Sequence, residues 1–212
     1  MDDEYPRPMD TRRRVSESLL VICDLDRMVI DCEARFTHAE QAHAKGTPEY
    51  WQAALDPDKL AFDLPLPGAR AFLHQWRKLA GLCYVTSRPV ACHDQTVAFL
   101  SQHGYPCAEQ VICRPLRKGL TTPRFKGLTV RALTYGLSPR IINRHFRLVT
   151  HRGILFLLAL WSWVRNTRKV VLFVDDSEKN RLMILKLGLA AYVTGSLEEA
   201  NAWLCLNSNN KG

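Results

Sequence analysis

The sequence has no long run of apolar residues. Its longest apolar segment, GILFLLALWSWV at residues 153–164, falls well short of the roughly 20 residues that a membrane-spanning helix needs. The first 18 residues combine charges with prolines and contain no apolar core of the kind found in a signal peptide. We therefore expect no transmembrane segment, with residues 1–17 and 207–212 as flexible tails.

Closely spaced cysteine pairs are also absent. The seven cysteines are odd in number and scattered, and several lie in apolar runs, where a reduced thiol packs as a small apolar side chain. No two of them have the CxxC spacing of a structural zinc site. This pattern disfavours metal binding by cysteine and predicts a protein of a reducing, cytoplasmic compartment.

Acidic residues are the scarcer charged group. The chain has 21 Asp and Glu against 29 Lys and Arg, which gives a formal net charge of +8 at pH 7. Such an excess favours polyanionic partners such as nucleic acid. Because 47% of the 212 residues are hydrophobic, the chain can bury a sizeable core, and we expect one globular domain over residues 18–206.

Strands and helices alternate along the predicted domain. Apolar residues recur at helical spacing over residues 69–80, and Ser177 and Ser196 stand where two later helices should begin. Strands that are apolar throughout and alternate with helices predict an α/β fold with a Rossmann-like, doubly wound parallel sheet of about five strands. The five expected strands are Leu19 to Cys23, Leu82 to Val85, Gln110 to Cys113, Val170 to Val174 and Ala190 to Val193.

Polar side chains follow three of these strands directly. In a parallel sheet the carboxyl ends of the strands share one edge, and ligands bind beyond it. We therefore expect the polar residues of the three strand ends to meet at one site. They are Asp24 and Asp26 after the first strand, Thr86, Ser87 and Arg88 after the second, and Asp175 and Asp176 after the fourth.

Four carboxylates at one point repel one another unless a cation lies between them. A hard divalent cation with oxygen ligands, Mg²⁺ in our interpretation, would be held by Asp24, Asp26, Asp175 and Asp176. Asp24 could then attack phosphorus and form an aspartyl-phosphate. Asp26 could protonate the leaving oxygen and later deprotonate the hydrolytic water, while Thr86 holds the transferred group in line.

The ordered motifs VICDLD, CYVTSRP and VLFVDDSEKN, each at a strand end, resemble the haloacid dehalogenase-like superfamily. The resemblance spans most of residues 17–205 and implies a Mg²⁺-dependent phosphatase. Carried over by position, the family roles make Asp24 the nucleophile and a metal ligand, Asp26 the acid/base, and Thr86 the phosphate binder. The two remaining acids around the metal are then Asp175 and Asp176.

The resemblance also implies a lysine that stabilises the transferred phosphoryl charge. Lys126, in TPRFKGLTVRAL, is our assignment for this third motif because it precedes a helical pattern. Lys118 and Lys169 are the rival candidates.

The residues after the second aspartate depart from the family pattern. Most members of the superfamily have Gly and Thr there, in a tight loop, whereas this chain has Arg27 and Met28. The guanidinium fork suits phosphate oxygens, so we expect Arg27 and Arg88, together with Ser87, to bind substrate.

Two further segments extend the predicted α/β domain. Residues 33–66 are long enough for a small helical flap or lid, in which Thr47 should cap a helix that begins at Pro48. Residues 137–169 mix arginines with aromatic residues. They predict either an amphipathic helical insertion packed on the sheet, which we favour, or a basic surface for nucleic acid, anionic lipid or another subunit.

We therefore expect a Mg²⁺-dependent phosphomonoesterase. Nucleic acid 3′-phosphate ends are the leading substrate class, because the charge is basic and a small flap leaves the site open to a large substrate. Parts of the chain resemble the phosphatase part of phage-type polynucleotide kinase/phosphatases, and equally the small acid phosphatases. The alternatives are a small-molecule phosphatase acting on nucleotides or sugars, and a non-catalytic binding protein of the same fold; the oligomeric state is left open.

Overall fold

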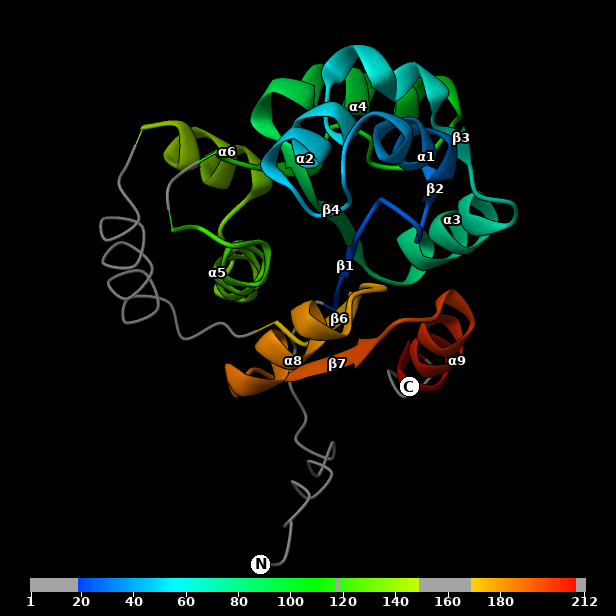
Figure 1. Ribbon diagram of the computed structural model, residues 1–212. Helices are drawn as coiled ribbons and strands as arrows, with labels where there is room; N and C mark the ends of the chain where they lie inside the picture. The colour runs from blue at the N-terminus through cyan, green and yellow to red at the C-terminus, as the bar shows by residue number, and fades with distance from the viewer. Residues whose placement is uncertain (1–18, 117–118, 149–168, 209–212) are drawn as a thin grey trace, which may run out of the picture.

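The computed structural model describes residues 19–116, 119–148 and 169–208. Its central feature is a five-stranded sheet in the order β5-β4-β1-β6-β7, in which every neighbouring pair is parallel (Figure 1). The expected doubly wound parallel sheet is thereby confirmed. The strands are β1 (Leu20–Cys23), β4 (Gly81–Pro89), β5 (Val111–Arg114), β6 (Val171–Val174) and β7 (Ala191–Thr194).

Helices cover both faces of the sheet, which explains why the central strands are apolar throughout. One face packs on α3 (Ala69–Leu79), α4 (His93–Gln102) and α9 (Leu197–Ser208). The other packs on α5 (Thr122–Thr134), α6 (Pro139–Leu148) and α8 (Glu178–Lys186). Alternate residues of β1 divide between the two cores, with Val21 and Ile22 both fully buried on opposite faces.

Local sequence signals account for the element ends. The expected helix over residues 69–80 is confirmed as α3, whose buried Trp76 donates its indole N–H to Asn201 Oδ1 at 3.1 Å. Strand β4 runs four residues beyond its predicted end at Val85, through the register shift between Thr86 and Pro89. This extension carries Arg88 into the interior at the carboxyl edge of the sheet.

The insertion between β1 and α3 is a compact flap. It contains β2 (Ile30–Asp31), α1 (Glu33–Ala42), α2 (Pro48–Ala54), the 3₁₀ helix η1 (Pro57–Phe62) and β3 (Leu64–Pro65), and β2 pairs antiparallel with β3. Thr47 caps α2 as expected, because its Oγ1 accepts the Tyr50 N–H at 3.2 Å. In Figure 1, α1 and α2 lie beyond the end at which the chain leaves β1. The flap therefore stands over the carboxyl edge of the sheet.

Some predicted segments lie partly outside the described residues. Helix α6 covers the first part of the basic segment 137–169, with Arg140 and Arg144 exposed, but residues 149–168 are not described. The tails predicted at 1–17 and 207–212 are likewise not described, except that α9 continues to Ser208. Within the described ranges, no helix has the length and apolar content to cross a membrane.

Candidate active site

Three carboxylates converge where two neighbouring strands end. Asp24 follows β1, and Asp175 and Asp176 follow β6, whose last residue Val174 pairs with Cys23. One oxygen from each of the three carboxylates lies within 4.8 Å of the other two. Asp24 and Asp175 are buried, whereas Asp176 is exposed, so the acidic cluster opens to solvent on one side.

Lys126 joins this cluster from α5. Its Nζ lies 2.7 Å from Asp24 Oδ2 and 2.6 Å from Asp175 Oδ2, and the side chain is buried. Burial would lower the pKa of Lys126, but the two carboxylates raise it, so the ammonium group stays charged. Of the rival lysines, Lys169 precedes the amino end of β6, at the opposite edge of the sheet, and Lys118 lies outside the described residues.

One oxygen of Asp24 is left without a partner. Lys126 contacts Oδ2, whereas Oδ1 is buried and accepts no hydrogen bond from any residue that the structure describes. Burial raises the pKa of Asp24 to about 7, with Lys126 opposing the rise and Asp175 adding to it. An unsatisfied buried oxygen is costly, and three converging carboxylate oxygens are the donor set that a hard divalent cation prefers. Asp24, Asp175 and Asp176 therefore fit a divalent metal site.

Neighbouring groups fix the two carboxylates of β6. The Asn180 side-chain amide lies 3.0 and 3.2 Å from the two carboxylate oxygens of Asp175, and the Ser177 N–H donates to Oδ1 at 2.9 Å. Arg181 donates to the main-chain carbonyls of both Asp175 and Asp176. Sequence reasoning missed Asn180, although its position on the first turn of α8, above the strand end, could have indicated it.

Asp26 is not one of the three converging carboxylates. Its Oδ1 lies 2.6 Å from Arg88 Nη2 and 2.8 Å from Arg35 Nη2. Burial would raise the pKa of Asp26, but the two guanidinium groups, Arg88 above all, lower it to about 2. The structure thus places the predicted acid/base in an ion-pair network, in which both arginines bind its oxygens, and does not bring it into the group of three acids expected to hold the metal.

Asp63 completes that network. Its two oxygens accept from Arg35 Nε at 2.9 Å and from Arg88 Nη2 at 2.7 Å, and all three of these side chains are buried. The network of Asp26, Arg35, Asp63 and Arg88, hereafter the Asp26 network, balances two carboxylates with two guanidinium groups. Arg35 and Asp63 belong to the flap, so the network also fastens the flap to the end of β4.

Arg27 keeps the backbone shape that glycine would provide. Its φ is +64°, a left-handed conformation that costs a non-glycine residue roughly 1–2 kcal/mol. The side chain is half exposed and lies over the Phe36 ring, 5.2 Å from its centroid, and 3.6 Å from Glu33. The chain therefore forms a tight loop after Asp26 with an arginine at its left-handed position, and the Met28 and Val29 N–H groups donate to the Leu25 carbonyl.

Thr86 and Ser87 lie on the neighbouring strand. Thr86 is fully buried, and its hydroxyl accepts the Arg88 N–H at 3.2 Å. Ser87, half-buried, lies at the register shift of β4. Because β4 pairs with β1 up to Tyr84 and Cys23, Val85 is the next residue in register with Asp24, and Thr86 and Ser87 follow it at the carboxyl edge of the sheet.

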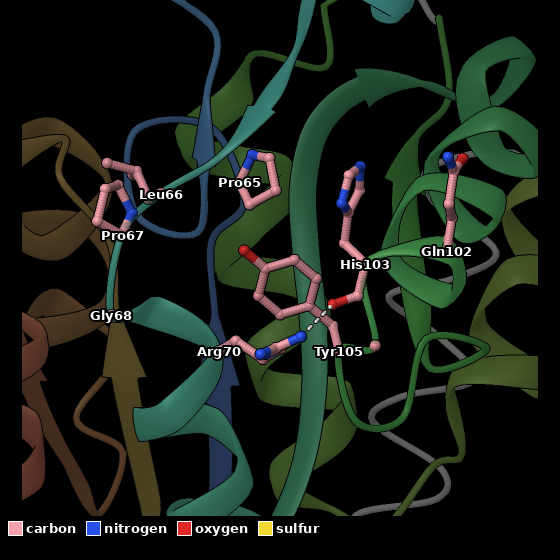
Figure 2. Close-up of a pocket in the computed structure, with 9 residues that line it drawn as sticks. Pro65, Leu66, Pro67, Gly68, Arg70, Gln102, His103 and Tyr105 are labelled. Atoms are coloured by element: carbon pink, nitrogen blue, oxygen red, sulfur yellow. Dashed lines mark hydrogen bonds between the residues drawn. The ribbon is translucent and has the colours of Figure 1, made fainter.

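A separate cavity of about 430 Å³ lies between residues 65–68 and residues 102–105 (Figure 2). Arg70 forms part of its wall and donates to the His103 carbonyl, and the Tyr105 hydroxyl donates to the Val29 carbonyl at 3.0 Å. No carboxylate of the acidic cluster lines this cavity. The candidate active site is therefore the strand-end cluster and not the cavity.

Comparisons with known proteins support the fold. No family model and no curated protein matches the sequence. Among solved structures, a haloacid dehalogenase-like family hydrolase from Streptococcus pneumoniae is 12% identical, with a TM-score of 0.50 over 87% of this chain and 97% of that one. The acidic cluster thus lies at the carboxyl edge of a sheet that is similar to one found in a hydrolase.

Two further solved structures are similar over smaller shares of their length. A class C acid phosphatase from Bacillus anthracis is 25% identical over 50% of this chain and 44% of that one, with a TM-score of 0.40. The Pnkp1/Rnl/Hen1 RNA repair complex is 16% identical over 86% of this chain and 45% of that one, with a TM-score of 0.45. The chain therefore spans less than half the length of either protein. The match to the Streptococcus hydrolase, which covers most of both chains, is a similarity of fold.

Proposed function

We propose that the chain is a Mg²⁺-dependent phosphomonoesterase that works through an aspartyl-phosphate on Asp24. The observation that carries the proposal is the unpartnered, buried Oδ1 of Asp24 in a cluster with Asp175, Asp176 and Lys126. A purely structural carboxylate at this depth would have both oxygens satisfied. The arrangement is instead suited to a group that forms bonds to something outside the chain.

Each residue of the cluster has a distinct role in the proposed reaction. Asp24 attacks phosphorus, and Lys126, fixed between Asp24 and Asp175, orients the nucleophile and offsets negative charge on the transferred group. Asp24, Asp175 and Asp176 would hold the metal. Mg²⁺, when bound, supplies positive charge that reduces the repulsion between the carboxylate and the phosphoryl oxygens. Thr86 and Ser87 border the same space and would orient the phosphate.

Asp26 is the proposed acid and base, and the Asp26 network governs its protonation. With a pKa near 2, this carboxyl holds no proton at neutral pH in the free protein. An anionic substrate beside the network would raise that pKa, since a nearby negative charge disfavours ionisation. Proton transfer by Asp26 is therefore expected only in the substrate complex.

Nucleic acid 3′-phosphate ends are the proposed substrate class. The net charge of +8 favours polyanions, and the flap presents an exposed aromatic side chain, Trp51, with its ring centroid 6.3 Å from that of Phe36. Arg27 lies over the other ring of this pair. Exposed aromatic and arginine side chains beside a phosphate site suit the stacking of a nucleobase. Mononucleotides and sugar phosphates are the alternative small substrates.

A second candidate function is a phosphate-binding protein without turnover. The tight hold of Arg35 and Arg88 on Asp26 favours it, because a carboxyl fixed in two ion pairs is a poor proton donor. Phosphate release from p-nitrophenyl phosphate separates the two candidates. A phosphatase releases phosphate with Mg²⁺ and stops in excess EDTA; a binding protein releases none under either condition.

A further inference from the structure

Arg114, at the end of β5, is a partly buried cation without a counter-charge. Its Nε is buried and has no hydrogen-bond partner among the described residues, and its Nη1 makes a long contact, 3.5 Å, to the Leu120 carbonyl. Within residues 19–116, 119–148 and 169–208, no carboxylate lies at ion-pair distance from it. Burial lowers the pKa of Arg114, and no neighbouring acid opposes that change.

Two other arginines at this edge of the sheet have their charge balanced by carboxylates. Arg35 and Arg88 are more deeply buried than Arg114, but each contacts two carboxylates in the Asp26 network. A desolvated charge with no partner reduces stability, and that cost is offset when an anion binds it. Arg114 therefore has the properties of one half of an ion pair whose other half comes from a ligand.

The position of Arg114 relates it to the candidate active site. Only β4 separates β5 from β1, and Arg114 pairs with Pro89, directly after Arg88. Two strand spacings place it roughly 10 Å to the side of Asp24, at the same carboxyl edge. A nucleic acid strand carries one phosphate per roughly 3.4 Å of helix rise. A strand whose terminal phosphate lies at Asp24 can thus bring an upstream phosphate to Arg114.

The start of α5 adds to the same site. This helix begins at Thr122, two residues after the Leu120 carbonyl that Arg114 contacts, and the Thr121 side chain does not cap it. The first N–H groups of a helix favour an anion, although Pro123 supplies no N–H in this turn. Arg124, exposed in the first turn, places a further positive charge there.

We propose that Arg114 and the first turn of α5 bind an internucleotide phosphate of the substrate, one that is not transferred. The proposal rests on the phosphatase function above and deepens it, because it makes a nucleic acid strand a better substrate than a mononucleotide. The phosphate that reacts lies at Asp24; the phosphate at Arg114 fixes the strand.

The test compares substrates with one and with several phosphates. Arg114→Gln should raise KM for a 3′-phosphorylated hexanucleotide roughly tenfold or more, since a charge-assisted hydrogen bond is lost, and should leave p-nitrophenyl phosphate and a 3′-mononucleotide within about twofold of the wild type. Arg114→Lys should recover part of the loss, because charge is kept but the fork is not. Arg131→Ala, which removes a partly buried arginine from the other end of α5, is the matched control and should change neither KM.

A stability measurement excludes a merely structural role. Arg114→Gln should unfold at the same temperature as the wild type or higher, because the variant removes an uncompensated charge. A lower unfolding temperature, or an equal loss on all three substrates, would overturn the proposal, and so would an unchanged KM for the hexanucleotide. If the wild type hydrolyses none of the substrates, the proposed phosphatase function is wrong, but the phosphate site at Arg114 can still be tested. Fluorescence anisotropy of a labelled hexanucleotide then measures binding. Equal affinity in the wild type and Arg114→Gln would overturn the proposed site.

Discussion

The two groups of charged residues at the carboxyl edge of the sheet differ in charge balance and in whether their polar atoms all have partners. The Asp26 network pairs two carboxylates with two guanidinium groups, and every one of the four side chains has its partners within the chain. The acidic cluster sets three carboxylates against the single ammonium group of Lys126 and leaves one oxygen of Asp24 unsatisfied. A single residue, Leu25, separates Asp24 from Asp26, so burial alone does not distinguish the groups.

The difference indicates separate tasks. A balanced, fully hydrogen-bonded network fixes geometry, and here it fastens the flap to β4. An unbalanced cluster is stable only when something else supplies charge, and here that is the proposed metal ion and phosphate. The most informative variants are those that disturb one group and leave the other intact.

The largest effect is expected from Asp24→Asn. The amide has the shape of the carboxylate but is not nucleophilic, so kcat for p-nitrophenyl phosphate should fall at least about a thousandfold. Circular dichroism and the unfolding temperature should stay close to those of the wild type. Retention of most of the activity would show that Asp24 is not the nucleophile.

Asp63→Asn is the corresponding change in the Asp26 network. It leaves two buried guanidinium groups with one carboxylate, and breaking a buried ion pair in this way costs about 3–5 kcal/mol of unfolding free energy. Urea denaturation measures the loss. Asp176→Asn removes an acid from the exposed side of the other group and should change stability by less than about 1 kcal/mol. Equal losses of unfolding free energy in the two variants would contradict the difference in charge balance between the Asp26 network and the acidic cluster.

Much of this edge of the sheet could be predicted from the sequence, because strands buried on two faces are apolar throughout and their carboxyl ends meet. Asp24, Asp175 and Asp176 follow such strands, and the structure brings them together. The Asp26 network could not be predicted, since it joins residues 26 and 35 to residues 63 and 88 through an inserted flap whose packing no local pattern encodes. For the same reason the sequence does not predict that Arg114 has no carboxylate partner among the described residues, since this depends on how distant segments pack.

Metal binding should depend on pH through Asp24. Because its pKa is raised to about 7 in the metal-free protein, this carboxyl stabilises the fold at low pH, and its contribution is lost as pH rises through 7. Mg²⁺ needs the ionised form, so it should bind more tightly at pH 8 than at pH 6.

Thermal unfolding with and without the ion measures this dependence. At a hundred times its dissociation constant, Mg²⁺ should stabilise by about 2.7 kcal/mol at pH 8, and the same concentration should stabilise less at pH 6. In Asp24→Asn the difference between the two pH values should disappear. A shift that is the same at both pH values in the wild type would contradict the role of Asp24 as a ligand.

The smallest effect is expected on the flap. Trp51→Ala removes the exposed stacking surface and should raise KM for a 3′-phosphorylated oligonucleotide about fivefold or more, because stacking of one base contributes roughly 1–3 kcal/mol. Trp51→Phe, the matched control, should keep most of the affinity. If an oligonucleotide with an abasic 3′ end loses as much affinity in Trp51→Ala as the intact one, the tryptophan does not stack on that base.

Chemical trapping can detect a covalent phosphoryl group on Asp24. Wild-type protein is mixed with excess p-nitrophenyl phosphate and Mg²⁺, quenched in acid and reduced with borohydride, and its peptides are read by mass spectrometry. Reduction of an acyl phosphate converts aspartate to homoserine, so we expect homoserine at residue 24 with Mg²⁺ and unmodified aspartate in EDTA. Steady phosphate release with unmodified Asp24, or homoserine at another aspartate, would contradict it.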